Sequence, residues 1–427
     1  MASFSIPLTG LEADSTALNT IANDLSNMNT TAFKSESTQF SDLFYQQIGS
    51  TGSGDPIQVG AGVKVASNEI AFSQGSINST GNATDVALNG SGFFVVSNGG
   101  GGYEYTRAGN FSLDSSGALV TSNGLNVMGY PAVNGVVNTN APLTAIRVPV
   151  GQVQQPRATT SLGMTANLDA TTGAGTQFPA EVTVYDSLGE PHVATVNFEP
   201  GAAPNTWTYS AELPAADYAG AAPAAITGTM TFDANGNLTT ITPTGGAAET
   251  VGTAAGDVQS IALAFNGLAD ASNDLAIQWN LLDASGKPTI SQVDTASDVS
   301  ATTQDGYPSG QYKDFTIGSD GTVTASYSNG QKQNVGQLAL GNVSNLQGLA
   351  LLGDGDYATT LASGTATVGA SGAGGLGTLQ DDALEASNVN ISTEFSNLII
   401  AQRAFEANAK SVTTFDTVTQ DTINMVH

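Results

Sequence analysis

Few side chains in this sequence could carry out chemistry. Cysteine is absent, which excludes disulfides, zinc–thiolate sites and thiol nucleophiles. The two histidines are His192, in the expected turn that starts at Ser187, and His427, the last residue. Two distant histidines form neither a metal-binding cluster nor a convincing Ser-His-Asp triad, and a turn histidine is usually solvated. We therefore expect no catalytic, cofactor-binding or metal-binding residues.

The acidic residues give no clearer site. Asp354-Gly355-Asp356 has the start of a calcium loop but lacks its remaining oxygen ligands, so we expect a turn there. Asp381 and Asp382 fit the N-terminus of a helix, where the helix dipole favours negative charge. Phosphate-binding, serine-hydrolase and zinc-protease motifs are absent from the sequence. Two separated acids of a glycosidase stay open as an alternative, although nothing in the sequence favours them.

Composition excludes several classes of partner. The formal net charge is −27 with only 10 Lys and Arg, so the chain cannot neutralise many phosphates or anionic lipid headgroups. The sequence has no apolar run of about 18 residues, and we expect no membrane insertion. The N-terminus shows no secretory signal, because acids come early and the first basic residue is Lys34. The composition is nevertheless typical of extracellular β-rich proteins.

The two ends of the chain show the clearest periodicity of apolar residues. If both ends form helices that pair, the segments between them are held at one end of that pair. Apolar residues recur every seventh position at the N-terminus and in two columns at the C-terminus, which puts each set on one side of a helix. The C-terminal segment from about Asp381 has no Gly or Pro, and Ser387 and Asn388 could cap its first turn. The expected interface residues are Leu11, Leu18, Leu25, Phe33, Ile391, Phe395, Leu398, Phe405 and Val412.

A C-terminal helix of this length would span roughly 60–70 Å, which is long for a helix packed inside one domain. Two interpretations remain open from the residues alone. The two terminal helices either form a hairpin whose apolar faces pack against the middle of the same chain, or they pair as a coiled coil that also contacts other chains.

Between the helices the sequence is typical of β structure, with short alternating strands separated by Gly and Asn turns. Three segments that start at Phe111, Phe232 and Phe315 share the pattern of a hairpin. We therefore expect an α+β, mainly β protein with two nested β domains between the terminal helices. The expected divisions are 1–35 and 380–427 for the helical domain, 36–74 and 362–379 for connecting segments, 75–150 and 300–361 for the first β domain, and 151–299 for an inserted β domain.

Both ends carry a resemblance to the bacterial flagellar axial proteins, the rod, hook and hook-associated family. The N-terminal motif is Asn23-Asp24-Leu25-Ser26-Asn27 followed by Thr31–Ser35, with Asp24 where many members have Asn. Further matching stretches are Asp85–Leu88, Gly92–Phe94, Tyr105–Gly109, Gly129–Pro131, Gly336–Leu338, Glu385–Asn390, Ile400–Phe405 and Asn408–Lys410. Within the family, two features are similar to those of hook subunits. They are the inserted domain and the segment Thr303–Tyr307, where the chain returns to the first β domain.

The resemblance implies a structural subunit that polymerises into a curved hollow tube, a universal joint between rod and filament and an export channel. It implies an extracellular location in the flagellum and export through the flagellar type III apparatus without a cleaved signal. The implied partners are further copies of the chain, the distal rod protein, the hook cap protein and the hook–filament junction proteins. A distal rod protein is the alternative, and a secreted β-rich adhesin or enzyme is a more distant one.

Uncharged polar residues on the terminal helices suggest one more role. Where a solvent-facing helix would normally carry Lys and Glu, these helices carry several asparagines. If this face lined the tube lumen, neutral side chains would let unfolded cargo of either charge pass. A general scarcity of charge is an equally good explanation. The possible lumen-facing residues are Asn19, Asn23, Asn27, Asn397 and Asn408.

Overall fold

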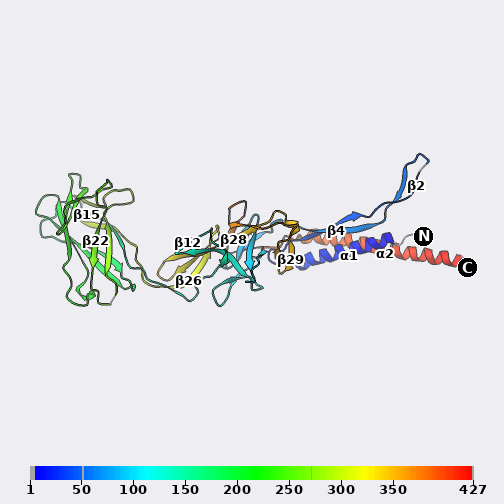
Figure 1. Ribbon diagram of the computed structural model, residues 1–427, viewed down its shortest axis with the longest axis horizontal. Coiled ribbons are helices and arrows are strands. Elements are labelled where there is room, and N and C mark those ends of the chain that lie inside the picture. The colour runs from blue at the N-terminus through cyan, green and yellow to red at the C-terminus, as the bar shows by residue number, and fades with distance from the viewer. Residues whose placement is uncertain (1–4, 51, 98, 271, 426–427) are drawn as a thin grey trace. The chain divides into compact units, whose positions relative to one another are not determined.

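The computed structural model describes residues 5–50, 52–97, 99–270 and 272–425, and it is mainly β with one helix near each end (Figure 1). The chain divides into two compact units. The first comprises 1–150, 314–326 and 332–427, and the second comprises 151–313 and 327–331. Strand β26 (Gly310–Ile317) crosses from the second unit into the first, at residue 313.

The helices are α1 (Ser5–Ser26) and α2 (Ile391–Met425). The expectation that α2 starts near Asp381 is wrong, because Asp381 ends strand β32 and Asp382, with φ of 50°, turns the chain into β33. The helix cap is Asn390, whose Oδ1 accepts the Thr393 N–H at 3.2 Å. Neither described helix combines the length and apolar character needed to span a bilayer.

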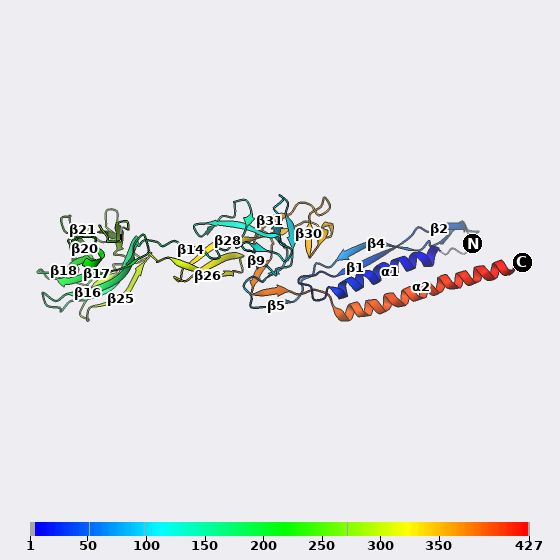
Figure 2. The same ribbon diagram turned by 90° about the horizontal axis from the view of Figure 1, so that it is seen from below.

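The two helices lie antiparallel and side by side (Figure 2). The buried positions of α1 are mostly small residues instead of the expected leucine column. Gly10 allows the close approach of Asn408 on α2, since a Cβ at this position would lie 2.6 Å from the Asn408 amide nitrogen and would displace that side chain. The helices therefore pair, although their contact does not establish a coiled coil. The buried residues are Pro7, Gly10, Ala13, Thr20 and Asp24 on α1 and Ala401 on α2.

A long hairpin follows α1 within 36–74, where a connecting segment was expected. Strand β1 (Glu36–Asp42) pairs antiparallel with β4 (Val63–Ile70), and β2 (Gln46–Ser50) pairs with β3 (Pro56–Val59) farther out. The hairpin lies against α1, where the Thr38 hydroxyl donates to the Thr20 hydroxyl at 3.1 Å. Thus α1 is held between α2 and the hairpin.

The β part of the first unit is built on one large sheet with neighbouring strands β27, β28, β11, β7, β8, β30 and β29. Its core contains the aromatic residues Phe93, Tyr105 and Tyr357. The expected linker after Ser363 contributes β31, which pairs with β28. The strands of this unit are β5 (Ile77–Ser79), β6 (Val86–Asn89), β7 (Phe93–Ser97), β8 (Glu104–Thr106), β9 (Ser112–Leu113), β10 (Leu119–Val120), β11 (Asn126–Val133), β12 (Val136–Val137), β13 (Thr144–Ala145), β27 (Thr322–Tyr327), β28 (Lys332–Asn342), β29 (Ala350–Gly353), β30 (Asp356–Ala358), β31 (Thr367–Ala370), β32 (Thr378–Asp381) and β33 (Ala383–Glu385).

The three predicted hairpins are confirmed. Each has a glycine in the left-handed region at its turn, with φ of 76° at Gly117, 81° at Gly236 and 83° at Gly321. A side chain at these positions would be strained, so the glycines determine where each strand reverses.

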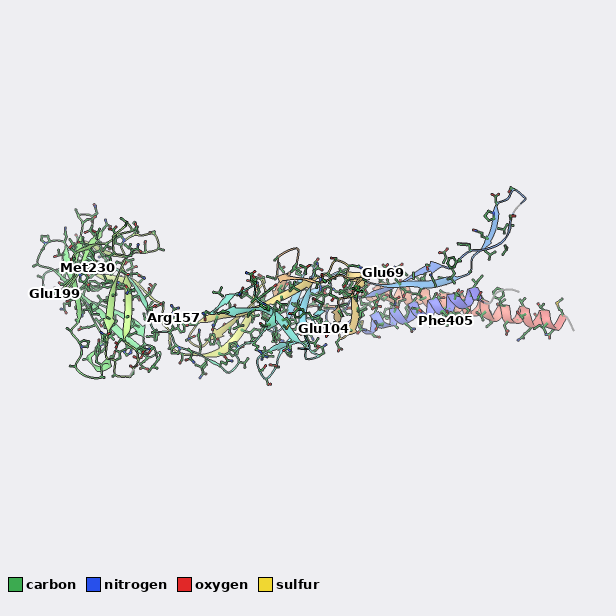
Figure 3. The ribbon with its side chains drawn as sticks, viewed as in Figure 1. Glu69, Glu104, Arg157, Glu199, Met230 and Phe405 are labelled. Carbon is green, nitrogen blue, oxygen red and sulfur yellow. The ribbon has the colours of Figure 1, made fainter. Side chains whose placement is uncertain are left out.

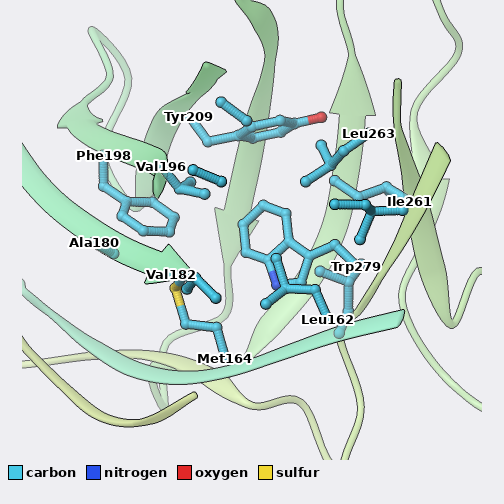
Figure 4. Packing of buried hydrophobic residues seen from close by; sticks show 14 of the residues in the cluster. Leu162, Met164, Ala180, Val182, Val196, Phe198, Tyr209, Ile261, Leu263 and Trp279 are labelled. Carbon is cyan, nitrogen blue, oxygen red and sulfur yellow. The ribbon is translucent and has the colours of Figure 1, made fainter. Parts of the chain in front are cut away.

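Two sheets of the second unit meet through their inward side chains in one core (Figure 4), whereas its strand β14 pairs with β26. The fully buried Trp279 is at its centre, 6.1 Å from the Phe198 ring and 5.8 Å from the Tyr209 ring. The strands are β14 (Val153–Gln154), β15 (Ser161–Asp169), β16 (Phe178–Tyr185), β17 (Pro191–Pro200), β18 (Thr206–Glu212), β19 (Ile226–Phe232), β20 (Leu238–Pro243), β21 (Glu249–Thr250), β22 (Ser260–Phe265), β23 (Leu275–Asn280), β24 (Ile290–Val293) and β25 (Asp298–Gln304), with the short 3₁₀ helix η1 (Ala215–Asp217).

This core predicts the effect of a truncation. Trp279→Ala should lower the free energy of unfolding of the second unit by about 3–5 kcal/mol, because it removes a buried ring and leaves a cavity. Val193→Ala, at a position that is 40 % exposed in the same unit, is the control and should change it by less than about 1 kcal/mol. Denaturant unfolding followed by circular dichroism measures both, and equal effects would contradict this description of the core.

Candidate functional site

Three of the motif segments meet at a buried carboxylate in the first unit. The Glu385 side chain is 0 % exposed, and its Oε1 lies 2.5 Å from the Lys34 ammonium, which is 1 % exposed. Its Oε2 lies 3.4 Å from an Arg107 guanidinium nitrogen. A buried charge is tolerated only when it is paired and hydrogen-bonded, so this arrangement constrains all three segments.

Backbone groups complete the hydrogen bonding around this carboxylate. The Gly75 N–H donates to Glu385 Oε1 at 2.8 Å, and Lys34 donates to the Ser73 carbonyl at 2.9 Å. Arg107 donates to the Gly90 carbonyl at 2.7 Å. Burial lowers the pKa of both Lys34 and Arg107, while the interaction with Glu385 acts in the opposite direction.

Asn388 ties the same segments together through neutral groups. Its Oδ1 accepts the Ser35 N–H at 2.8 Å, and its Nδ2 donates to the Ala71 carbonyl at 2.7 Å and the Ser73 carbonyl at 3.1 Å. Asn388 is therefore a link between segments and not the helix cap that its position in the sequence suggested. We refer to Lys34, Arg107, Glu385 and Asn388 together as the junction.

Asp24 fixes the end of α1 beside the junction. Its carboxylate is buried and accepts the Glu36 N–H at 3.0 Å, where β1 begins. Burial raises the pKa of Asp24 to about 6, and this hydrogen bond acts in the opposite direction. The position where many members of the family have Asn is thus a contact between α1 and the hairpin.

Two other pairs of motif segments meet inside the first unit. Gly129–Pro131 on β11 lies antiparallel to Gly336–Leu338 on β28, residue for residue. Gly109, in the segment Tyr105–Gly109, lies against the segment Asp85–Leu88. A Cβ at Gly109 would lie 1.7 Å from the Val86 carbonyl oxygen. The motifs therefore mark contacts between distant parts of the chain.

The expected interface residues do not all face the partner helix. Ile391 is 46 % exposed, Phe395 53 % and Phe405 37 %, and Figure 3 labels Phe405 on α2. The others are half-buried, namely Leu11, Leu18, Leu25, Phe33, Leu398 and Val412. Ile399 and Ile400, which lie beside the apolar columns in the sequence but were not among the expected interface residues, are also exposed, at 57 % and 67 %.

The expected lumen-facing asparagines differ in their surroundings. Asn19, Asn23 and Asn397 are exposed, whereas Asn27 is half-buried and its side chain donates to the Asn23 carbonyl at 3.0 Å. Asn408 does not fit the expectation, because it lies between the helices and donates to the Asp14 carboxylate at 2.9 Å.

His192 is not the solvated turn residue that was expected. It lies at the start of β17 and is 6 % exposed, and its Nδ1 is 2.9 Å from Asp217 Oδ2. Asp354 and Gly355 form a turn between β29 and β30, as expected. Asp356 is buried on β30, where burial raises its pKa and Asn123 donates to its Oδ2 at 2.6 Å.

Three family models match the chain. Residues 87–167 match the "Flagellar hook protein FlgE/F/G D1 domain", 157–307 the "Flagellar basal body protein FlaE D2 domain" and 380–425 the "Flagellar basal body rod FlgEFG protein C-terminal". The chain is 34 % identical to the flagellar hook protein FlgE of Salmonella typhimurium strain LT2, over 99 % of this chain and 100 % of that protein.

The chain belongs to the flagellar hook protein FlgE family. Its similarity to the FlgE proteins of Escherichia coli K12 is 34 % identity, over 99 % of each chain. The chain is 32 % identical to FlgE of Treponema pallidum, over 98 % of each chain. The function is therefore that of a hook subunit, and the distal rod alternative is not favoured.

A solved structure agrees with the FlgE fold. The crystal structure of Helicobacter pylori flagellar hook protein FlgE2 superposes with a TM-score of 0.51 at 16 % identity, over 72 % of this chain and all of that one. At this level of identity the likeness concerns the fold alone. The structural role of the FlgE family also indicates that the chain is not an enzyme.

The junction predicts a large effect from one substitution. Glu385→Gln should lower the free energy of unfolding of the first unit by about 3–5 kcal/mol, because it leaves two buried cations without a carboxylate. Glu406→Gln is a matched control, since Glu406 is 65 % exposed in its ion pair with Arg403. It should cost less than about 1 kcal/mol. Denaturant unfolding of the full chain measures both, and equal midpoints would contradict the role assigned to Glu385.

Proposed function

We propose that this chain polymerises with copies of itself into the hook through the outer faces of α1 and α2. The observation that carries this proposal is the apolar surface of α2. Phe395, Ile399 and Ile400 are 53 %, 57 % and 67 % exposed, although they are large and close to one another along the helix. Monomeric soluble proteins rarely expose contiguous apolar surface of this kind, so a neighbouring copy is its natural partner.

The hairpin beside α1 supports the same assembly. At its outer end Phe44 is 91 % exposed, and Ile48 and Ile57 on the paired strands are also exposed. Covering apolar surface contributes roughly 25 cal/mol per Å² removed from water. Neighbouring copies would therefore be stabilised by contacts to both the helices and the hairpin.

A groove among α1, β1 and α2 gives one place where a neighbour could insert a side chain. Its volume is about 340 Å³, and its apolar lining includes Ile21, Phe40 and Ile400. Asn397 also borders it. A groove of this size accommodates one or two apolar side chains of a second copy.

The wider role follows from membership of the FlgE family. We propose a curved hollow tube outside the cell that acts as a universal joint between rod and filament and as an export channel. Its partners would be the distal rod protein, the hook cap protein, the hook–filament junction proteins and the flagellar type III export apparatus, which would export the chain without a cleaved signal. Asn19 and Asn23, which are neutral and exposed, stay candidates for the lumen surface.

The assembly proposal predicts a selective defect. Phe395→Ala should raise the critical concentration for polymerisation about ten-fold or more, because truncating a large anchor residue of an interface costs about 2 kcal/mol or more and about 1.4 kcal/mol is ten-fold. Folding of the monomer should not change, since this side chain is already exposed. Sedimentation and negative-stain electron microscopy measure the polymer.

The matched control is Leu188→Ala, which removes a side chain that is 61 % exposed in the second unit. It should leave the critical concentration unchanged. Tubes that form equally well from the Phe395→Ala chain would show that the α2 surface is not an assembly contact.

A further inference from the structure

The inserted unit contains a buried cluster of polar side chains to which the hook function assigns no role. It lies where the turn between β16 and β17 meets η1 and the loop that follows β22. Asp186 begins the turn, and its Oδ1 accepts the N–H groups of Leu188 at 2.9 Å and Glu190 at 2.8 Å. Its other oxygen, Oδ2, takes no part in the turn.

Two buried atoms face each other without a hydrogen-bond partner. Asp186 is fully buried and His192 is 6 % exposed, and within the described part of the chain neither Asp186 Oδ2 nor His192 Nε2 makes a hydrogen bond. The two atoms are 3.9 Å apart, which is too long for a direct hydrogen bond. Leaving such buried groups unsatisfied is unfavourable, so the arrangement requires an explanation.

Asp217 sets the tautomer of the imidazole. His192 Nδ1 is 2.9 Å from Asp217 Oδ2, so Nδ1–H donates to this carboxylate. The other ring nitrogen, Nε2, lies 3.9 Å from Asp186 Oδ2, and a cation placed between these two atoms would satisfy both. A carboxylate behind a histidine is also the usual second partner of a metal-binding imidazole.

A third ligand comes from the opposite sheet of the unit. A carboxylate oxygen of Asp270, an oxygen of Asp186 and a ring nitrogen of His192 all lie within 4.8 Å of one another. Asp270 is exposed, which gives an ion a path to the buried pair.

We propose that Asp186, His192 and Asp270 bind a divalent transition metal ion of the zinc class. One imidazole and two carboxylates suit Zn²⁺ with a water as fourth ligand, whereas Ca²⁺ and Mg²⁺ take six or more ligands, almost all oxygen. Tetrahedral Zn²⁺ with bonds near 2.1 Å places its ligand atoms roughly 3.4 Å apart. Asp186 Oδ2 and His192 Nε2, now 3.9 Å apart, must approach by about 0.5 Å, and the exposed Asp270, whose oxygen lies within 4.8 Å of the other two ligands, must move by up to about 1.4 Å.

Such an ion would join the two sheets of the inserted unit. Asp186 and His192 belong to the sheet of β16 and β17, and Asp270 belongs to the loop between β22 and β23 of the other sheet. An ion that binds only the folded unit stabilises it in proportion to the logarithm of its concentration. The consequence is an inserted domain whose stability depends on metal.

Calorimetric titration of the untagged full chain with Zn²⁺ alone tests the proposal. We expect one ion per chain and a rise in the unfolding temperature that EDTA reverses. Asp270→Asn should weaken binding at least ten-fold, and its exposed position leaves the fold intact. Asp217→Asn should weaken binding by about ten- to a hundred-fold, because Asp217 positions the imidazole without touching the ion.

Two control variants identify the site. His427→Gln removes the other histidine of the sequence, and Asp294→Asn removes an exposed carboxylate of the same unit. Both should bind Zn²⁺ as the natural chain does. Equal unfolding temperatures of the Asp270→Asn and natural chains in EDTA would show that the variant is folded. Absence of Zn²⁺ binding, or binding that survives Asp270→Asn but is lost in His427→Gln, would overturn the proposal.

Discussion

The buried carboxylate of Glu385 neutralises two cations that come from distant parts of the chain, Lys34 after α1 and Arg107 in the β part of the first unit. In a chain with only 10 Lys and Arg, placing two of them around one buried acid is a strong constraint. Any arrangement that separated these segments would leave a charge unpaired inside the protein. The junction therefore holds the start and the end of the chain against the same β structure.

This constraint explains why the helices can leave their apolar faces uncovered. The junction holds the segment after α1 against the segment before α2, and Asp24 fixes the end of α1, so the helices do not depend on a large apolar contact with each other. Their contact uses small residues such as Gly10 and Ala13. The large side chains of α2 then remain available to other copies, as a subunit of a polymer requires.

The sequence predicted features that depend on local pattern. Alternating residues such as Val182 and Val184 indicated strands with one buried face, and the hairpin glycines indicated turns. It failed where a distant contact decided the outcome. Asp381 was expected to lie at the start of a helix, but its segment pairs with β6. His192 was expected to be solvated, but it is buried beside Asp186 and Asp217. Glu385 was part of a recognised motif, yet only the fold shows which cations it meets.

The outer face of α2 is exposed in the single chain, and assembly into a tube should cover it. Because the sequence contains no cysteine, Ile400→Cys gives one thiol on that face and Ala202→Cys gives one in an exposed turn of the second unit. Maleimide labelling of both chains should be rapid as monomers. In assembled tubes, position 400 should be protected at least ten-fold while position 202 stays reactive. Equal labelling of position 400 in monomer and tube would show that neighbouring copies do not cover this face of α2.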